Sequence, residues 1–265
     1  MKAIQRLPAI VALAGSCLCA PAWSASYSTD QSDLWWIPDE SGWGIQLVQR
    51  NSTIFATMFV YDASGAPTWY VSTMNANGLT WQGDLYATRG PWFATVPFDP
   101  STVNVTKVGT MTWAPATVEA GTLTYTVNEA QVTKALQREF MAVDDFGGDY
   151  GGNLHQVDAD CSDAAQNGTT DLVSAVAVRQ DGSQVVLATA DENGQVCTYS
   201  GTLAQAGQMA NVHGTFNCND GSAGTFSIYE LQVTVSGITM RFTLHPISSG
   251  CATTGWFGGG RATTF

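Results

Sequence analysis

Short runs rich in Thr, Val and aromatic residues recur along almost the whole chain, separated by Gly, Asn, Asp and Pro. Runs of this length between turn residues are typical of antiparallel strands. Pairs such as Asn77-Gly78, Asp181-Gly182 and Asn193-Gly194 accept the positive φ of tight hairpins. Only Glu129–Phe140 is open to a helical interpretation, and Gln131–Arg138 within it also fits a strand. The pattern therefore predicts an all-β protein.

Residues 1–25 have the layout of a secretory signal peptide, with a basic start, an apolar stretch over Leu7–Ala14 and small residues up to Ala25. The apolar stretch is too short to span a bilayer, and no later stretch reaches the ~20 apolar residues of a membrane helix. We therefore expect export to the periplasm or the medium, with no membrane span. A lipid anchor at Cys17 or Cys19 is the alternative.

The charge balance excludes some classes of partner. The chain has a net charge of −12, and loss of Lys2 and Arg6 with the signal would leave eight basic residues against 22 acidic ones, a net charge of −14. An acidic surface repels phosphate backbones, so we expect no nucleic-acid partner. The same repulsion disfavours docking on anionic lipid head groups.

The two halves of the expected mature chain share matches in the same order. They include Glu129–Thr133 with Glu230–Thr234, Ala120–Leu123 with Ala223–Phe226, Asp62…Gly65 with Asp191…Gly194, and Gly42-Trp43-Gly44 with Asp149-Tyr150-Gly151. Ordered matches of this kind indicate a tandem duplication. We predict an aromatic-rich β-domain over 26–142, a linker over 143–148 and a disulfide-bonded β-domain over 149–265. A barrel is favoured over a sandwich for both.

Four cysteines, all in the second half, remain after the signal. An even number in an exported chain indicates two disulfides. The second half contains about eight expected strands, so the first and last would be antiparallel neighbours in an up-and-down barrel, with Cys161 beside Cys251. Cys197 and Cys218 are equidistant from the turn at Gly207-Gln208, which places them opposite each other in a hairpin. We therefore predict Cys161–Cys251 and Cys197–Cys218.

The most distinctive segment runs from Trp35 to Tyr70. It reads Trp-Trp-Ile-Pro-Asp-Glu-Ser-Gly-Trp-Gly at its start, then has a Phe-rich strand that ends Tyr61-Asp62, and closes with Gly65-Ala-Pro-Thr-Trp-Tyr70. The segment resembles a family of exported bacterial proteins with the pattern Trp-(Tyr/Trp)-x-Pro-x-Glu-Ser-Gly-Trp-Gly, followed by Tyr-Asp and Gly-x-Pro-Thr-Trp-Tyr. The resemblance implies export and β-structure, and it implies no activity.

A looser similarity connects the chain with calycin barrels of the lipocalin and avidin kind. Trp43 near an early strand and Arg261 in the last strand are similar to the Trp and Arg that close such barrels. Here the two residues belong to different halves. The similarity implies a barrel architecture only.

Aromatic side chains of the first half form the candidate ligand-binding site, in which they could stack on a sugar or line an apolar pocket, with an acidic side chain for polar contacts. The candidates are Trp35, Trp36, Glu40, Trp43, Trp69, Tyr70 and Trp81. The alternative is that the aromatic residues pack a core that has no disulfide. Because neighbours on a strand point to opposite faces, one of Trp35 and Trp36 should lie outside the core.

Catalytic and metal-binding signals are weak. The histidines stand singly on separate expected strands, without metal-ligand spacing: His155, His213 and His245. Asp39 with Glu40, or Asp84, could form the carboxylate pair of a glycoside hydrolase, although solvation of the surface is the commoner use.

A group of aspartates, Asp158, Asp160 and Asp163, could chelate calcium but lacks the Gly and terminal Glu of an EF-hand loop. We expect no cofactor and no metal. The leading hypothesis is an exported, non-enzymatic binding module for a small molecule, a glycan or a protein. The alternatives are a structural or assembly protein of the cell envelope and a carboxylate-dependent hydrolase.

Overall fold

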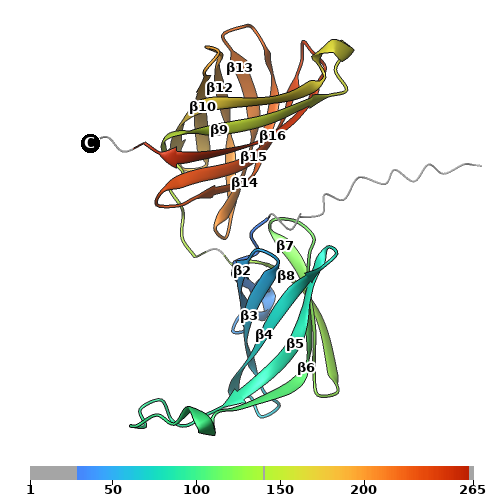
Figure 1. Ribbon diagram of the computed structural model, residues 1–265, viewed down its shortest axis with the longest axis vertical. Helices are drawn as coiled ribbons and strands as arrows, with labels where there is room; N and C mark the ends of the chain where they lie inside the picture. Colours follow the sequence, from blue (N-terminus) through green and yellow to red (C-terminus); the bar gives the residue numbers. More distant parts are fainter. Residues whose placement is uncertain (1–28, 140, 263–265) are drawn as a thin grey trace, which may run out of the picture.

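The computed structural model describes residues 29–139 and 141–262. These residues form two closed, antiparallel barrels of eight strands each, one after the other along the chain (Figure 1). The predicted all-β class and the barrel architecture are confirmed. The expected signal peptide and the alternative lipid anchor at Cys17 or Cys19 lie outside the described residues.

The first barrel consists of β1 (Asp33–Trp36), β2 (Gly44–Arg50), β3 (Thr53–Tyr61), β4 (Pro67–Asn77), β5 (Thr80–Arg89), β6 (Asn104–Pro115), β7 (Ala120–Val127) and β8 (Ala130–Arg138). Short 3-10 helices, η1 (Pro38–Glu40) and η2 (Pro100–Thr102), lie in its connections. Each strand pairs with the next, and β1 pairs with β8 to close the sheet. Closure leaves no strand edge exposed for pairing with another chain.

The second barrel consists of β9 (Gly148–Ala159), β10 (Gly168–Asp181), β11 (Gln184–Asp191), β12 (Val196–Ala206), β13 (Met209–Cys218), β14 (Ala223–Val233), β15 (Gly237–Pro246) and β16 (Ala252–Arg261). A further 3-10 helix, η3 (Ala164–Gln166), follows β9. Here β16 pairs with β9 to close the sheet.

Alternation of side chains explains why these segments form barrel strands. In β3, Ile54, Ala56 and Met58 are completely buried, whereas Phe55 and Phe59 are about half exposed on the outer face. This two-residue period is what a sheet with one buried face requires. The segment that allowed a helix, Glu129–Phe140, contains β8, so the extended interpretation is the correct one.

Three tryptophans, Trp35, Trp81 and Trp113, are completely buried inside the first barrel. The buried side chain of Gln31 accepts a hydrogen bond from Trp113 Nε1 at 3.1 Å, and its backbone carbonyl accepts one from Trp35 Nε1 at 3.0 Å. Because a buried indole N–H needs an acceptor, Gln31 makes this dense aromatic packing possible. The described core of this barrel is therefore filled by its own side chains.

Each barrel has an arginine over an aromatic ring at the seam between its first and last strands. Arg138 of β8 lies 4.6 Å from the ring centre of Trp35 of β1, and Arg261 of β16 lies 5.0 Å from that of Tyr150 of β9. Trp43 and Arg261, the residues that carry the similarity to calycin barrels, lie in different barrels and do not form such a pair. The equivalent first-strand aromatics are Trp35 and Tyr150, because β1 begins before the Gly42-Trp43-Gly44 segment.

A buried carboxylate joins the two barrels. Asp33 Oδ2 pairs with Arg138 Nη1 at 3.0 Å and accepts a hydrogen bond from the backbone N–H of Gln208 at 2.9 Å. Gln208 lies in the turn between β12 and β13 of the second barrel, and its side chain donates to the Ser32 carbonyl at 2.5 Å. This end of the second barrel therefore faces the first barrel, and the opposite end is directed away from it.

Candidate ligand-binding cavity of the second barrel

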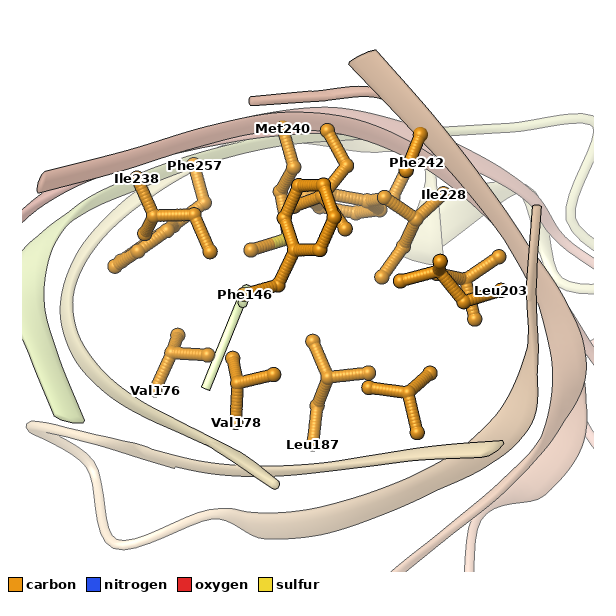
Figure 2. Close-up of a cluster of buried hydrophobic side chains, with 14 of the residues drawn as sticks. Phe146, Val176, Val178, Leu187, Leu203, Ile228, Ile238, Met240, Phe242 and Phe257 are labelled. Atoms are coloured by element: carbon orange, nitrogen blue, oxygen red, sulfur yellow. The ribbon is translucent and has the colours of Figure 1, made fainter. Parts of the chain in front are cut away.

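The end of the second barrel that faces the first is closed by Phe146. This residue precedes β9, and its completely buried ring lies among the inward side chains of the barrel wall (Figure 2). Its backbone is held in place, because its N–H donates to Gln180 Oε1 at 3.0 Å and its carbonyl accepts from Tyr150 Oη at 3.1 Å. Part of the segment expected to be only a linker is thus a plug for the barrel.

Above Phe146 the barrel wall is apolar. Aliphatic and aromatic side chains from most of the strands point inward, as Figure 2 shows for Val176, Leu187, Ile228, Met240, Phe242 and Phe257. They surround a small apolar pocket of about 50 Å³. The only polar side chains among the described residues that line this pocket are Gln156, Thr189 and Tyr199.

The pocket continues into a wider, polar mouth of about 330 Å³. Gln156, Tyr199 and Leu244 line both spaces, so the two form one funnel. Strand direction places the mouth at the end of the barrel that is directed away from the first barrel, since β12 runs from Cys197 at the mouth towards the Gly207-Gln208 turn. The mouth has the volume of a small binding site, and the apolar pocket below it is smaller. Binding sites for small molecules commonly combine an apolar wall with a few polar groups in this way.

Both disulfides lie at the mouth. The structure pairs Cys161 with Cys251 and Cys197 with Cys218, the two pairs predicted from the sequence. Cys197 and Cys218 are directly opposite each other on β12 and β13, and Cys251 precedes β16, next to the end of β9. Cross-links at these positions hold the rim together on two sides, where hairpin ends would otherwise separate most easily.

Tyr199 forms the transition between the apolar pocket and the mouth. Its ring stacks on Phe216 with a centre distance of 5.5 Å and meets the edge of Phe226 at 5.3 Å. Burial raises its pKa from 10.0 to about 12, and a hydrogen bond with Thr189 opposes that shift. Tyr199 is therefore a neutral phenol at physiological pH, and its hydroxyl can donate a hydrogen bond to a ligand or accept one from it.

Two carboxylates lie in the wall of the mouth. Asp158, at the end of β9, accepts hydrogen bonds from Gln156 Nε2 at 2.9 Å and from the hydroxyl of Thr253. Asp220, in the turn between β13 and β14, accepts a hydrogen bond from Gln195 Nε2 at 2.8 Å. Hydrogen bonds from the Ser222 hydroxyl and backbone lower the pKa of Asp220, so it is ionised at neutral pH.

The aromatic residues predicted as a site in the first half do not meet in one place. Trp35 and Trp81 are in the core, with no exposed surface. Tyr70 and Trp43 are partly buried and pack against that core. Trp36 follows Trp35 on β1 and is also partly buried, whereas Trp69 is 51% exposed on the outer face of β4. Part of the predicted site is therefore packing, as the alternative interpretation allowed.

Glu40 connects two parts of the first barrel. Its carboxylate is bound by Lys134 Nζ of β8 at 2.6 and 2.9 Å and accepts a hydrogen bond from Trp43 Nε1 at 3.0 Å. The hydrogen bonds from Lys134 and Trp43 lower the pKa of Glu40. A carboxylate held in this way is suited to fixing the Trp43 ring and poorly suited to acting as a general acid.

The other candidate chemical groups are dispersed. Asp84 pairs with Lys107 at 2.8 Å, and Asp163 caps η3 through the backbone N–H of Ala165. His155 pairs with Asp171 at 2.7 Å on the outer surface. Among the described residues, no group of three His, Cys, Asp or Glu side chains is placed to hold a metal ion. In the same part of the chain, no helix has the length and apolar character needed to cross a membrane.

Comparison with known proteins gives little further information. No protein-family model and no curated protein matches the chain. A crystal structure described as a "putative outer membrane protein" from Bacteroides fragilis has 14% identity, covers 86% of this chain and 95% of its own, and superposes with a TM-score of 0.33. A DUF3598-family protein of unknown function from Nostoc punctiforme has 9% identity, with 88% and 94% covered and a TM-score of 0.25. These scores are too low to support any functional argument.

Proposed function

We propose that this protein is an exported, non-enzymatic binding protein that holds a small molecule in the funnel of its second barrel. The observation that carries the proposal is the continuity of the apolar pocket with the polar mouth through Gln156, Tyr199 and Leu244. An apolar part of a ligand would occupy the pocket, and its polar part would meet the mouth. The two disulfides support the exported location, because such bonds persist in oxidising compartments.

The arrangement of the barrel supports a preformed site. Phe146 closes one end of the barrel, and the disulfides restrain the other end, where the mouth lies. A rigid cavity lowers the entropy lost on binding, because few side chains have to be ordered by the ligand. The first barrel, whose described core is filled by its own side chains, would act as a scaffold fixed to the second barrel through Asp33.

The test is binding of a neutral fluorescent probe, N-phenyl-1-naphthylamine, to the mature protein. We expect a saturable increase in fluorescence that Leu244→Trp abolishes, because Leu244 lines both the pocket and the mouth. Val173→Trp is the matched control, since Val173 is 56% exposed on the outer face of β10. Thermal unfolding establishes that both variants fold. Absence of saturable binding, or equal binding by wild type and folded Leu244→Trp, would contradict the proposal.

A second candidate function is self-assembly of this protein through the first barrel. Four aromatic residues, which we name the aromatic face, are 47–58% exposed on β3 and β4: Phe55, Phe59, Tyr61 and Trp69. Exposed apolar patches of this kind are typical of interaction surfaces. Sedimentation velocity over a range of concentrations tests the candidate, with Trp69→Ser as the variant and Trp256→Ser, 47% exposed on the second barrel, as the control. A monomer at all concentrations would exclude self-assembly.

A further inference from the structure

The charge of the mouth restricts the chemistry of its ligand. Asp158 and Asp220 line the mouth, and none of the described residues that line it is Lys, Arg or His. We propose that the funnel selects amphiphiles that have a protonated amine at the polar end of an apolar chain, and that it rejects the corresponding carboxylates. This inference rests on the proposed binding function, because it assigns the head group of the ligand that the funnel holds.

Asp158 is the central residue in this selectivity. The alternation along β9 places it on the inner face, above Gln156 and Leu154. Gln156 Nε2 donates to one carboxylate oxygen and the Thr253 hydroxyl donates to the other, so both oxygens are fixed in position. Each oxygen of a carboxylate has capacity for a second hydrogen bond. A ligand ammonium group at this level of the funnel would find a preoriented acceptor.

Asp158 forms no ion pair with any residue that the structure describes. No salt bridge among residues 29–139 and 141–262 involves Asp158, although six others are present. Its hydrogen-bond donors, Gln156 and Thr253, are neutral. A carboxylate partly removed from water attracts a cation more strongly than a solvated one does, because the effective dielectric constant is lower.

Asp220 adds negative charge from the opposite wall. In the closed strand order, β9 and β13 are separated by three strands on either side, so Asp158 and the turn after β13 face each other across the mouth. Arg261 lies at the closed end, where it donates to the Gly147 carbonyl next to the Phe146 plug. An anionic head group at the mouth would therefore meet two like charges and no compensating base.

The experiment compares octylamine, octanol and octanoate by isothermal titration calorimetry at neutral pH. These ligands share one apolar chain and differ in head-group charge. We expect octylamine to bind roughly tenfold or more tightly than octanol, with octanoate weakest, and we expect added salt to reduce the differences. Asp158→Asn should lower the affinity for octylamine to that for octanol. Asp171→Asn, on the outer surface beside His155, is the control and should change nothing.

The outcomes separate this inference from the proposed function. If the three ligands bind with equal affinity, or if folded Asp158→Asn keeps the preference for the amine, the head-group inference is wrong and the binding function stands. If none of the three binds and N-phenyl-1-naphthylamine does not bind either, the binding function itself is wrong. Tighter binding of octanoate than of octylamine would overturn the inference directly.

Discussion

Arg138 lies over the ring of Trp35, with 4.6 Å from its guanidinium carbon to the ring centre, directly across the seam where β8 meets β1. The guanidinium also pairs with Asp33, which in turn binds the second barrel through the backbone of Gln208. One side chain thus takes part in closing the first barrel and in joining it to the second. The corresponding Arg261 covers Tyr150 but donates to the Gly147 carbonyl, within its own barrel.

This difference predicts unequal effects of removing the two arginines. Arg138→Met should destabilise the protein by about 3–5 kcal/mol, because it leaves Asp33 as a buried charge without its partner. Arg261→Met should cost less, since it removes a cation–π contact and a hydrogen bond to a neutral carbonyl. Urea unfolding measures both values. A greater loss for Arg261→Met would contradict the assignment of Arg138 as the joint.

The disulfides should differ in their contribution to stability. Cys161–Cys251 links residues 90 apart in sequence and Cys197–Cys218 links residues 21 apart, so the first restricts the unfolded chain more. Replacing the first pair by alanines should cost about 4–5 kcal/mol, and replacing the second about 3 kcal/mol. Unfolding in guanidinium measures the two losses. Equal losses would show that restriction of the unfolded chain is not the main source of their stabilisation.

Alkaline pH should destabilise the second barrel through Tyr199. Its pKa is 10.0 when unperturbed and about 12 in the folded protein, so the folded state retains a proton that the unfolded state has released. The stability from this difference is complete below the unfolded pKa and is lost as the pH rises through the folded pKa. Compared with Tyr199→Phe, the wild type should lose about 1 kcal/mol by about pH 11. A parallel pH dependence of both proteins would contradict this prediction.

The number of strands in the second barrel could be predicted from the sequence, because it depends on local features, whereas the short first strand of the first barrel, β1, is missed. The turn at Asp62 is repeated at Asp191: each carboxylate accepts two backbone N–H groups, and each turn has a glycine with positive φ, Gly65 or Gly194. Both turns connect the third and fourth strands of their barrels. The strand count of the second half indicates Cys161–Cys251, and the turn at Gly207-Gln208 indicates Cys197–Cys218.

The alignment of the two halves was less accurate, since short Gly- and Thr-rich matches do not fix a register. Glu129 precedes the eighth strand of its barrel, whereas Glu230 lies within the sixth strand of the other, at a β-bulge. The same ambiguity led to Trp43 in place of Trp35 as the aromatic that closes the first barrel. Correct equivalences require the strand pairs, which depend on contacts distant in sequence.

The cavity was not predicted, although β9 contains a signal for it. Along the inner face of this strand, Tyr150 and Leu154 are followed by Gln156 and Asp158, so polarity increases towards the mouth. A core strand would keep apolar residues at these positions. The sequence instead predicts a binding site in the Trp-rich segments of the first half. Trp35 and Trp81 of this predicted site are buried in the first barrel, because large rings contribute most to burial.

Phe146 should determine both the stability of the second barrel and the depth of its cavity. Phe146→Ala is expected to cost about 3–5 kcal/mol, because it removes a completely buried ring from the closed end of the barrel. Amide hydrogens should exchange faster in β9–β16 and keep their protection in β2–β7, whose core does not include this ring. Val143→Ala, which alters a 73% exposed residue of the same segment, is the control.

The same variant tests whether the Phe146 ring limits the length of the ligand. If the folded Phe146→Ala protein binds alkyl amines with chains longer than octylamine more tightly than the wild type does, the ring is the floor of the ligand cavity. Unchanged chain-length preference, with the same loss of stability, would show that Phe146 is a packing residue below the reach of the ligand.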